Sequence, residues 1–288
     1  MWPRRKLEFH DLITLGSPQS VQGVNVAGLA NQIRCLLAIQ VLGHTPLIRR
    51  DAEFRKRVSA NEGIDPAEIF GALQDSQSRW QAPYYREWYL PPVPSSAADA
   101  ELFNILNWYG LLNPSALPHM KEKTRPYRDA FAALQPNRVA VPERNAAGSA
   151  KLAIHLRMFD RNYTPRFDIK ASRKEHFGRF YAKQAWSQER VKLLLDIAIK
   201  SSDAGEDIAI YSDDVNHPVA MEIFSELSRQ GRAPAFADSQ PAGLTHSQTA
   251  LYDLLSLSCH PRLILTATSS FGHMAALLNE DLESVVAA

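Results

Sequence analysis

In the second half of the chain, short apolar runs alternate with longer segments whose apolar residues have helical spacing. This alternation restricts the fold more than any other feature of the sequence. Short apolar runs typical of buried strands occupy residues 151–157, 207–211 and 262–266, and a further short strand is expected near Ala235. Longer segments with apolar side chains at helical spacing separate these runs. Because strands that alternate with helices pair most readily in parallel, the pattern predicts an α/β fold with a mostly parallel sheet flanked by helices.

The same periodicity predicts the positions of the helices. In the second half, the expected helices span residues 187–200, 218–229, 249–258 and 270–278. In the first half, helices are expected at 27–42, 66–74, 98–112 and 124–134, with a strand at 45–49. The segment Pro142–Ser149 resembles an interdomain linker, so we expect a boundary near residue 148 and two α/β domains, 1–148 and 149–288.

Two segments of the first half have a structural and a functional interpretation. Residues 79–94 are rich in aromatic side chains and proline, which is typical of a packed loop and is also compatible with a surface on which sugars stack. The basic residues of the segment 121–128 indicate either a solvated helix face or a binding site for an acidic acceptor.

Composition excludes several classes of function. The chain has 32 Lys and Arg against 31 Asp and Glu, so it lacks the strong positive field that concentrates nucleic acid or an anionic membrane. Cys35 and Cys259 both lie in apolar helical segments, where a small buried thiol is expected and a reducing compartment is indicated. No apolar run has the length of a signal peptide or a membrane span. We therefore expect a soluble, cytoplasmic protein without nucleic-acid partners.

Polar residues gather where three of the predicted strands end. The three clusters are His155, Arg157 and Asp160; Ser212, Asp213 and Asp214; and Thr268, Ser269 and Ser270. The carboxyl ends of parallel strands meet at one edge of a sheet, and ligands of open α/β sheets bind beyond that edge. The sequence therefore predicts one site built from all three clusters.

The first cluster indicates a diphosphate ligand. Arg157 alternates with Leu156 along the strand and is expected on the same face as His155, away from Ile154. A guanidinium offers a fixed fork of donors that suits a diphosphate. A structural ion pair between Arg157 and Asp160 is the alternative, and His155 is equally compatible with a hydrogen bond to nearby backbone.

The other two clusters also leave alternatives open. Ser269 and Ser270 begin a predicted helix, whose free amides and hydroxyls form an anion site, although serine is also a common helix cap. Asp213 and Asp214 are compatible with binding a ribose, a base or a cation, and equally with a turn that ends the strand.

Taken in order, four segments resemble motifs of the fucosyltransferase superfamily, which includes α-1,2-, α-1,6- and protein O-fucosyltransferases. The segments are Gly28-Leu-Ala-Asn31-Gln32, Ile154-His-Leu-Arg-Met-Phe-Asp160, Tyr211-Ser-Asp-Asp214 and Thr266-Ala-Thr-Ser-Ser-Phe271. They correspond to the family's glycine-rich first loop and to its HxRRxD, SDD and NSSFS-type motifs. The resemblance implies a GT-B-like fold, in which two Rossmann-like domains with mostly parallel sheets face each other across a cleft.

The resemblance also implies an activity. Members of the superfamily are inverting glycosyltransferases that move a sugar, usually fucose, from a GDP-sugar in the C-terminal domain to a glycan hydroxyl, with no obligatory metal or cofactor. The implied catalytic residues are Arg157, Asp160 and Asn31, with Arg157 stabilising charge on the departing GDP. Asp160 is the favoured general base, with Asp168 and Glu175 as further candidates and a structural role for Asp160 as the alternative.

The resemblance further implies a nucleotide-sugar site. Its residues are Gly28, His155, Arg157, Ser212, Asp213, Asp214, Thr268, Ser269, Ser270 and Phe271. In this set, His155 helps to position the nucleotide, Asp213 orients it, and the serines contact the pyrophosphate. Gly28 and Asn31 lie across the cleft near the reacting sugar, where a loop with glycine permits close approach.

The chain also departs from these motifs. Met158 stands where a second arginine is usual, Ala30 replaces a glycine, and Gly272 and His273 replace a serine and a tryptophan. A catalytically inactive relative that binds nucleotide sugars or glycans is therefore the alternative function. A hydrolase that uses Ser269 or Ser270 is disfavoured, because the chain lacks a G-x-S-x-G motif around them.

Overall fold

The computed structural model describes residues 20–22, 29–30, 33, 36–37, 40, 45–47, 64–71, 117–134, 136, 150–158, 186–237, 241–266 and 269–288. The second half of the chain builds a sheet of five parallel strands. These strands are β3 (Leu152–Leu156), β4 (Asp207–Ser212), β5 (Ala233–Phe236), β6 (Arg262–Leu265) and β7 (Ser284–Ala287). The expected α/β architecture with a parallel sheet is confirmed for this half.

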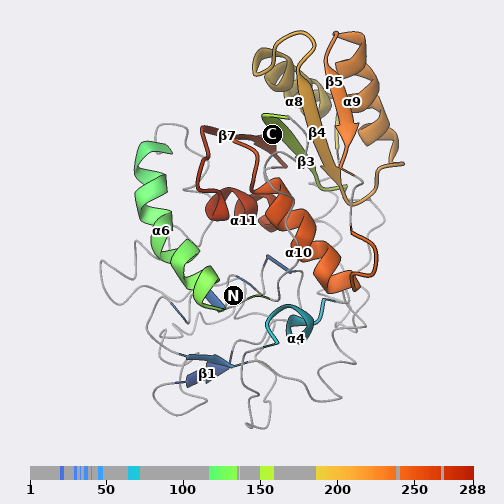
Figure 1. Ribbon diagram of the computed structural model, residues 1–288. Coiled ribbons are helices and arrows are strands. Elements are labelled where there is room, and N and C mark those ends of the chain that lie inside the picture. The colour runs from blue at the N-terminus through green and yellow to red at the C-terminus, as the bar shows by residue number, and fades with distance from the viewer. Residues whose placement is uncertain are drawn as a thin grey trace, which may run out of the picture.

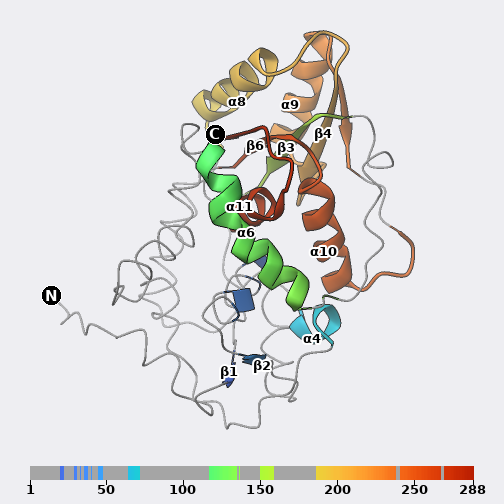
Figure 2. The same cartoon turned by 60° about the vertical axis from the view of Figure 1, so that its left-hand side comes forward.

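The order of the strands across the sheet is β5-β4-β3-β6-β7, so the first strand of the sheet lies in its middle. The chain moves outward from β3 through β4 to β5 (Figure 1), and then returns to β6 on the other side of β3 (Figure 2). The direction of winding reverses between β3 and β6. In open α/β sheets such a reversal opens a crevice at the carboxyl ends of the two strands.

Four helices cover the two faces of the sheet, and they are α8 (Gln188–Lys200), α9 (Pro218–Arg229), α10 (His246–Leu257) and α11 (Ser270–Leu278). Ile154 and Leu156 of β3 pack in one apolar cluster with residues of α8 and α9, whereas Ala153 packs in a second cluster with residues of α10 and α11. Figure 2 shows the two pairs of helices on opposite sides of the sheet. The period of two along β3 therefore divides its side chains between two cores.

The expected helices and strands of this half are confirmed, with two corrections. Helix α10 begins at His246 rather than at residue 249, because Thr245 and Gln248 form a capping box: Thr245 Oγ1 accepts from the Gln248 amide at 3.3 Å, and Gln248 Oε1 accepts from the Thr245 amide at 3.1 Å. Strand β7 was not predicted, because its short segment near the end of the sequence has no clear strand pattern.

The first half contributes helices that pack against α10 and α11. Its described elements are β1 (Ser20–Gln22), β2 (Thr45–Leu47), α4 (Pro66–Ile69) and α6 (Leu117–Ala133). Helix α4 is shorter than the expected 66–74, and α6 begins before the expected residue 124. Residues 29, 30, 33, 36 and 37 are helical and buried, as expected for 27–42. The expected helix 98–112, the aromatic segment 79–94 and Cys35 lie outside the described residues.

Hydrogen bonds join the two halves where α4 and α10 begin. The Asp65 amide donates to Ser247 Oγ at 2.9 Å, and Thr245 Oγ1 donates to Glu68 Oε2 at 2.8 Å. Residues of α6 and of the helix near residue 33 belong to the same apolar cluster as α10 and α11. A domain boundary near residue 148 and a cleft between two domains stay predictions. No helix in the described part of the chain is long and apolar enough to cross a membrane.

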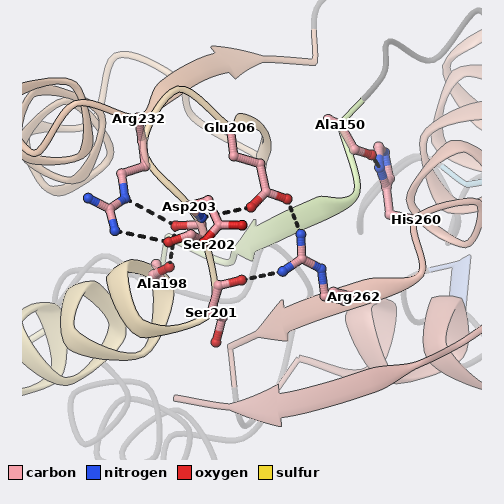
Figure 3. A network of polar contacts seen from close by, with 9 residues as sticks. All are labelled: Ala150, Ala198, Ser201, Ser202, Asp203, Glu206, Arg232, His260 and Arg262. Carbon is pink, nitrogen blue, oxygen red and sulfur yellow. Dashed lines mark hydrogen bonds and ion pairs between the residues drawn. The ribbon is translucent and has the colours of Figure 1, made fainter.

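Two arginines hold the amino-terminal edge of the sheet to the end of α8 (Figure 3). Arg232 Nη2 donates to the carbonyls of Ile199 and Ser202 at 2.8 and 2.9 Å. Arg262, the first residue of β6, pairs with Glu206 and donates to the Ser201 carbonyl. Because the last carbonyls of a helix have no intrahelical partner, these guanidinium groups satisfy acceptors that α8 leaves open.

Candidate functional site

The register of the sheet brings three of the predicted segments to one edge. Leu156 pairs with Ser212 of β4, and His155 pairs with Leu265 of β6. The next residues, Arg157, Asp213 and Thr266, therefore leave the sheet side by side at the carboxyl ends of the strands. This edge includes the point between β3 and β6 where the winding reverses.

Arg157 forms an ion pair with Asp213 at this edge. Arg157 Nη1 donates to Asp213 Oδ2 at 2.7 Å, and both side chains are about one third exposed, at 30% and 33%. The other carboxylate oxygen of Asp213 accepts from the Met158 amide at 2.7 Å. Asp213 therefore fixes both the guanidinium of Arg157 and the backbone that follows β3. Asp160, the partner considered from sequence, lies outside the described residues.

His155 is buried on the face of the sheet that α11 covers. Its ring stacks on Phe271, with centroids 5.4 Å apart and planes inclined by 20°. Burial, with smaller contributions from the charge of Arg157 and from His273, lowers the pKa of His155 to about 3. Its Nδ1 has no hydrogen-bond partner among the described residues. His155 is therefore a neutral imidazole at neutral pH, and Arg157 supplies the positive charge at this strand end.

Gly272 allows His155 and α11 to approach this closely. A Cβ atom on Gly272 would lie 3.0 Å from His155 Nδ1 and 3.0 Å from Leu265 Cδ2, closer than ordinary van der Waals contact. Glycine at this position therefore follows from the packing of β3 and β6 against the first turn of α11. This explains one departure from the family's motif in terms of this chain's own packing.

We expect Gly272→Ala to lower the free energy of unfolding by about 1 kcal/mol, because overpacking of about 1–3 kcal/mol exceeds the gain of up to about 1 kcal/mol in helix propensity. Urea unfolding of the variant and of wild type measures the difference. In a His155→Ala background, part of the crowding is absent, so the same substitution is expected to cost less. An equal cost in both backgrounds would contradict crowding by His155.

The start of α11 lacks the hydrogen bond of a serine cap. Ser269 is the N-cap residue of α11 and is buried, yet its side chain makes no capping hydrogen bond. The first amides of a helix have no intrahelical acceptor and attract negative charge. The serine-cap alternative therefore does not apply to Ser269. Ser270 and Phe271 follow in the first turn, and Phe271 reaches back over His155.

The residues after β4 divide into two roles. Ser212 Oγ donates to the Asp214 carbonyl at 3.0 Å and accepts from the Asp214 amide at 3.2 Å. Asp214 Oδ1 accepts from the Asn216 amide at 3.1 Å. Ser212 and Asp214 therefore build the turn that leads into α9, which is one of the alternatives considered from sequence. Asp213 points to Arg157 instead.

The structure groups some of the sequence-predicted residues and leaves others outside its description. His155, Arg157, Asp213, Ser269, Ser270 and Phe271 come together around the ends of β3 and β6. Gly28, Asn31, Asp160, Thr268, Asp168 and Glu175 lie outside the described residues, so their roles stay predictions. Two contributors were missed. Trp186 Nε1 donates to the Arg157 carbonyl at 3.0 Å, and Thr266 bonds to the same peptide segment.

No signal in the sequence identified Trp186, because it precedes α8 and reaches the site only through the fold. A weak signal existed for Thr266, a hydroxyl directly after the apolar strand Leu263-Ile-Leu265. Met158, where the family's second arginine is usual, is 9% exposed and packs in the apolar cluster with α8. The position therefore holds a core side chain.

We expect stability to decrease as the pH falls below the ordinary histidine pKa of 6.5. Burial lowers the pKa of His155 to about 3 and that of His273 to about 4, so the unfolded chain binds two protons that the folded chain does not. This contribution is complete above pH 6.5 and is lost progressively down to pH 4 for His273 and pH 3 for His155. Urea midpoints at pH 7.5, 6 and 5 measure the slope, and His273→Asn is expected to reduce it. An unchanged slope in that variant would contradict the assignment.

Comparison with known proteins returns structural similarities alone. No protein-family model matches the chain, and no curated protein matches it. A mutant of Arabidopsis thaliana FUT1 in complex with GDP is similar in structure, with 15% identity, 95% of this chain and 72% of that chain covered, and a TM-score of 0.43. NodZ α-1,6-fucosyltransferase soaked with GDP-fucose is similar at 13% identity, covering 90% of this chain and 92% of that chain, with a TM-score of 0.40.

A further similar structure is the fucosyltransferase NodZ from Bradyrhizobium, at 13% identity, with 90% of this chain and 93% of that chain covered and a TM-score of 0.39. The three structures represent two proteins, FUT1 and NodZ. These similarities concern the course of the backbone.

Proposed function

We propose that the chain is an inverting glycosyltransferase that moves fucose, or a related sugar, from a GDP-sugar to a glycan hydroxyl. The observation that supports the proposal is that Arg157 follows β3 and α11 follows β6, so that both begin at the carboxyl ends of neighbouring strands, at the switch point of the sheet. A cationic fork beside a helix N-terminus is suited to a diphosphate. The identification of the nucleoside as guanosine and of the sugar as fucose rests on the resemblance of the four sequence segments.

In this proposal, Arg157 acts on the leaving group. The acceptor oxygen forms a bond to the anomeric carbon while the bond to the β-phosphate oxygen breaks, and that electron pair stays on GDP. The guanidinium and the first amides of α11 stabilise the charge that develops there. Asp213 pairs with Arg157 in the absence of nucleotide, and the phosphates of the donor then compete with Asp213 for the guanidinium. His155 is neutral and shapes the site through its contact with Phe271.

The remaining roles in this proposal follow the motif resemblance. The C-terminal half, 149–288, binds the donor, and the N-terminal half, 1–148, binds the acceptor glycan and contributes Gly28 and Asn31. Asp160 takes the proton of the acceptor hydroxyl, with Asp168 and Glu175 as alternatives. No obligatory metal is part of this mechanism, since Arg157 and the helix amides carry the charge of the phosphates.

A second candidate is a relative that binds a nucleotide sugar without transferring it. The position of Met158 favours it, because an apolar side chain in the core stands where the family's motif has a second cation. A single guanidinium is enough to bind a diphosphate. Stabilisation of the transition state, in which more negative charge develops on the leaving group, depends more strongly on a second cation.

Calorimetric titration of the purified protein with GDP and GDP-fucose tests the proposal, with UDP and ADP as controls. We expect guanine nucleotides to bind and the controls to bind at least about tenfold more weakly, a difference of about 1.4 kcal/mol. No binding of any nucleotide would remove both candidates. Where GDP-fucose binds, release of GDP in the presence of glycan acceptors or of water alone distinguishes a transferase from a binding protein.

A further inference from the structure

Thr266 places a hydroxyl directly after the aliphatic run Leu263-Ile-Leu265 of β6. Thr266 directly follows Leu263, Ile264 and Leu265 of β6 in the sequence, and its side chain is fully buried, at 0% exposed. Valine has the same shape and is equally suited to a strand, so a buried hydroxyl here is unfavourable unless its hydrogen bonds are made. Both are made: Oγ1 donates to the His155 carbonyl and accepts from the Arg157 amide, each at 3.0 Å.

The Thr266 side chain replaces a backbone acceptor at the end of the ladder between β3 and β6. The Thr266 amide donates to the His155 carbonyl at 3.1 Å. In a continuing parallel ladder, the Arg157 amide would donate next to the Thr266 carbonyl. That carbonyl instead accepts from the Ser269 amide at 2.9 Å, as the chain turns toward α11. The Thr266 hydroxyl therefore keeps β3 joined to β6 at the point where the two backbones separate.

One residue is thus hydrogen-bonded to the backbone of His155, Arg157 and Ser269. The proposed function assigns the phosphates of the donor to Arg157 and to the start of α11, where Ser269 is the N-cap residue, and it gives His155 a part in shaping the site. The carbonyl of Arg157 accepts a hydrogen bond from the indole Nε1 of Trp186 at 3.0 Å. Thr266 therefore links Arg157 to the start of α11, because its hydroxyl accepts from the Arg157 amide and its carbonyl accepts from the Ser269 amide.

We infer that Thr266 is the positioning residue of this anion site: it does not touch the nucleotide and acts through the backbone of Arg157 and Ser269. The inference rests on the proposed function for the identity of the anion. The geometric part, that the hydroxyl sets the position of the Arg157 peptide, is measurable without any ligand.

The test compares Thr266→Val, which removes the hydroxyl and keeps the shape, with Thr266→Ser, which keeps the hydroxyl. Thr124→Val is the matched control, because Thr124 is also buried, at 3% exposed, but lies in α6 and accepts from Arg128 Nη1 at 2.6 Å. Hydrogen exchange of the Arg157 amide and the ¹⁵N-indole resonance of Trp186 report on the peptide. Trp186→Phe assigns that resonance among the 5 tryptophans.

In Thr266→Val, the Arg157 amide is expected to exchange at least about tenfold faster, because it loses its acceptor. The Trp186 indole resonance is expected to move, and GDP affinity to fall about tenfold, or about 1.4 kcal/mol. Thr266→Ser and Thr124→Val are expected to match wild type in all three measurements. Wild-type exchange and indole resonance in a folded Thr266→Val variant would overturn the inference.

Two further outcomes are also decisive. If Thr266→Val does not fold, Thr266→Ser decides: loss of GDP affinity in this variant would show that the γ-methyl group matters rather than the hydroxyl, and would overturn the inference. If wild type does not bind GDP, the proposed function fails by itself. Exchange at Arg157 and the Trp186 resonance then still decide whether the hydroxyl positions the peptide.

Discussion

Arg157→Ala is expected to weaken GDP binding at least about a hundredfold, equivalent to about 2.7 kcal/mol. The guanidinium is the positive group held at the switch point, and hydrogen bonds to a phosphate from a charged donor are stronger than neutral ones. Arg157→Lys keeps the charge but loses the planar fork, so an intermediate affinity is expected. Calorimetry with GDP measures both variants.

The fold is expected to survive the Arg157→Ala substitution. Asp213 keeps its bond to the Met158 amide at 2.7 Å, and both members of the Arg157–Asp213 pair are partly exposed, so solvent screens the carboxylate that remains. Arg229→Ala serves as the control, because Arg229 pairs with Glu226 on the exposed side of α9. Unchanged GDP affinity in a folded Arg157→Ala variant would contradict the proposed donor site, whatever the activity of the protein.

Arg262→Ala is expected to lower the free energy of unfolding by about 3 kcal/mol, because it leaves the half-buried carboxylate of Glu206 without its cation. The side chains of Arg262 and Glu206 are 23% and 16% exposed. The substitution also removes the donor to the Ser201 carbonyl at the end of α8, while Glu206 retains its bond from the Asp203 amide at 2.9 Å. Urea unfolding measures the loss.

A double-mutant cycle identifies the source of this loss. The variant that combines Arg262→Ala with Glu206→Ala removes both charges and is expected to be less destabilised than the sum of the single variants. Arg229→Ala, in an exposed pair, is expected to leave stability unchanged. GDP affinity is expected to be the same as in wild type in each folded variant, because Arg262 begins β6 at the edge opposite the site. Additive losses would contradict a coupled pair.

Much of the secondary structure in the second half follows from local pattern. A short apolar run, buried at every position, marks β3, and a period near 3.6 marks α8 with its N-cap Ser187. Sequence reasoning was less successful where capping or tertiary contacts set an element's limits. Helix α10 begins three residues early because of its capping box, and β7 is a strand because the edge of the sheet beside β6 accepts it.

The sequence also predicted that Arg157, Asp213 and Ser269 lie near one edge of the sheet, because the carboxyl ends of parallel strands share one edge whatever the order of the strands. It did not indicate their partners. From sequence, the candidate ion-pair partner of Arg157 is Asp160, three residues along the chain, whereas in the fold Arg157 pairs with Asp213 from the neighbouring strand. Local spacing carries no information about which strand lies next to β3.

Local hydrophobic pattern and polar residues at strand ends thus determined, from sequence alone, the class of fold, most elements of the second half and the chemistry available at one edge. The order β5-β4-β3-β6-β7 was decided only by the tertiary structure, and with it the switch point, the Arg157–Asp213 pair and the roles of Thr266 and Trp186. The physical reason is that periodicity reports which face of an element is buried, whereas a hydrogen bond between distant segments depends on packing that brings them within about 3 Å.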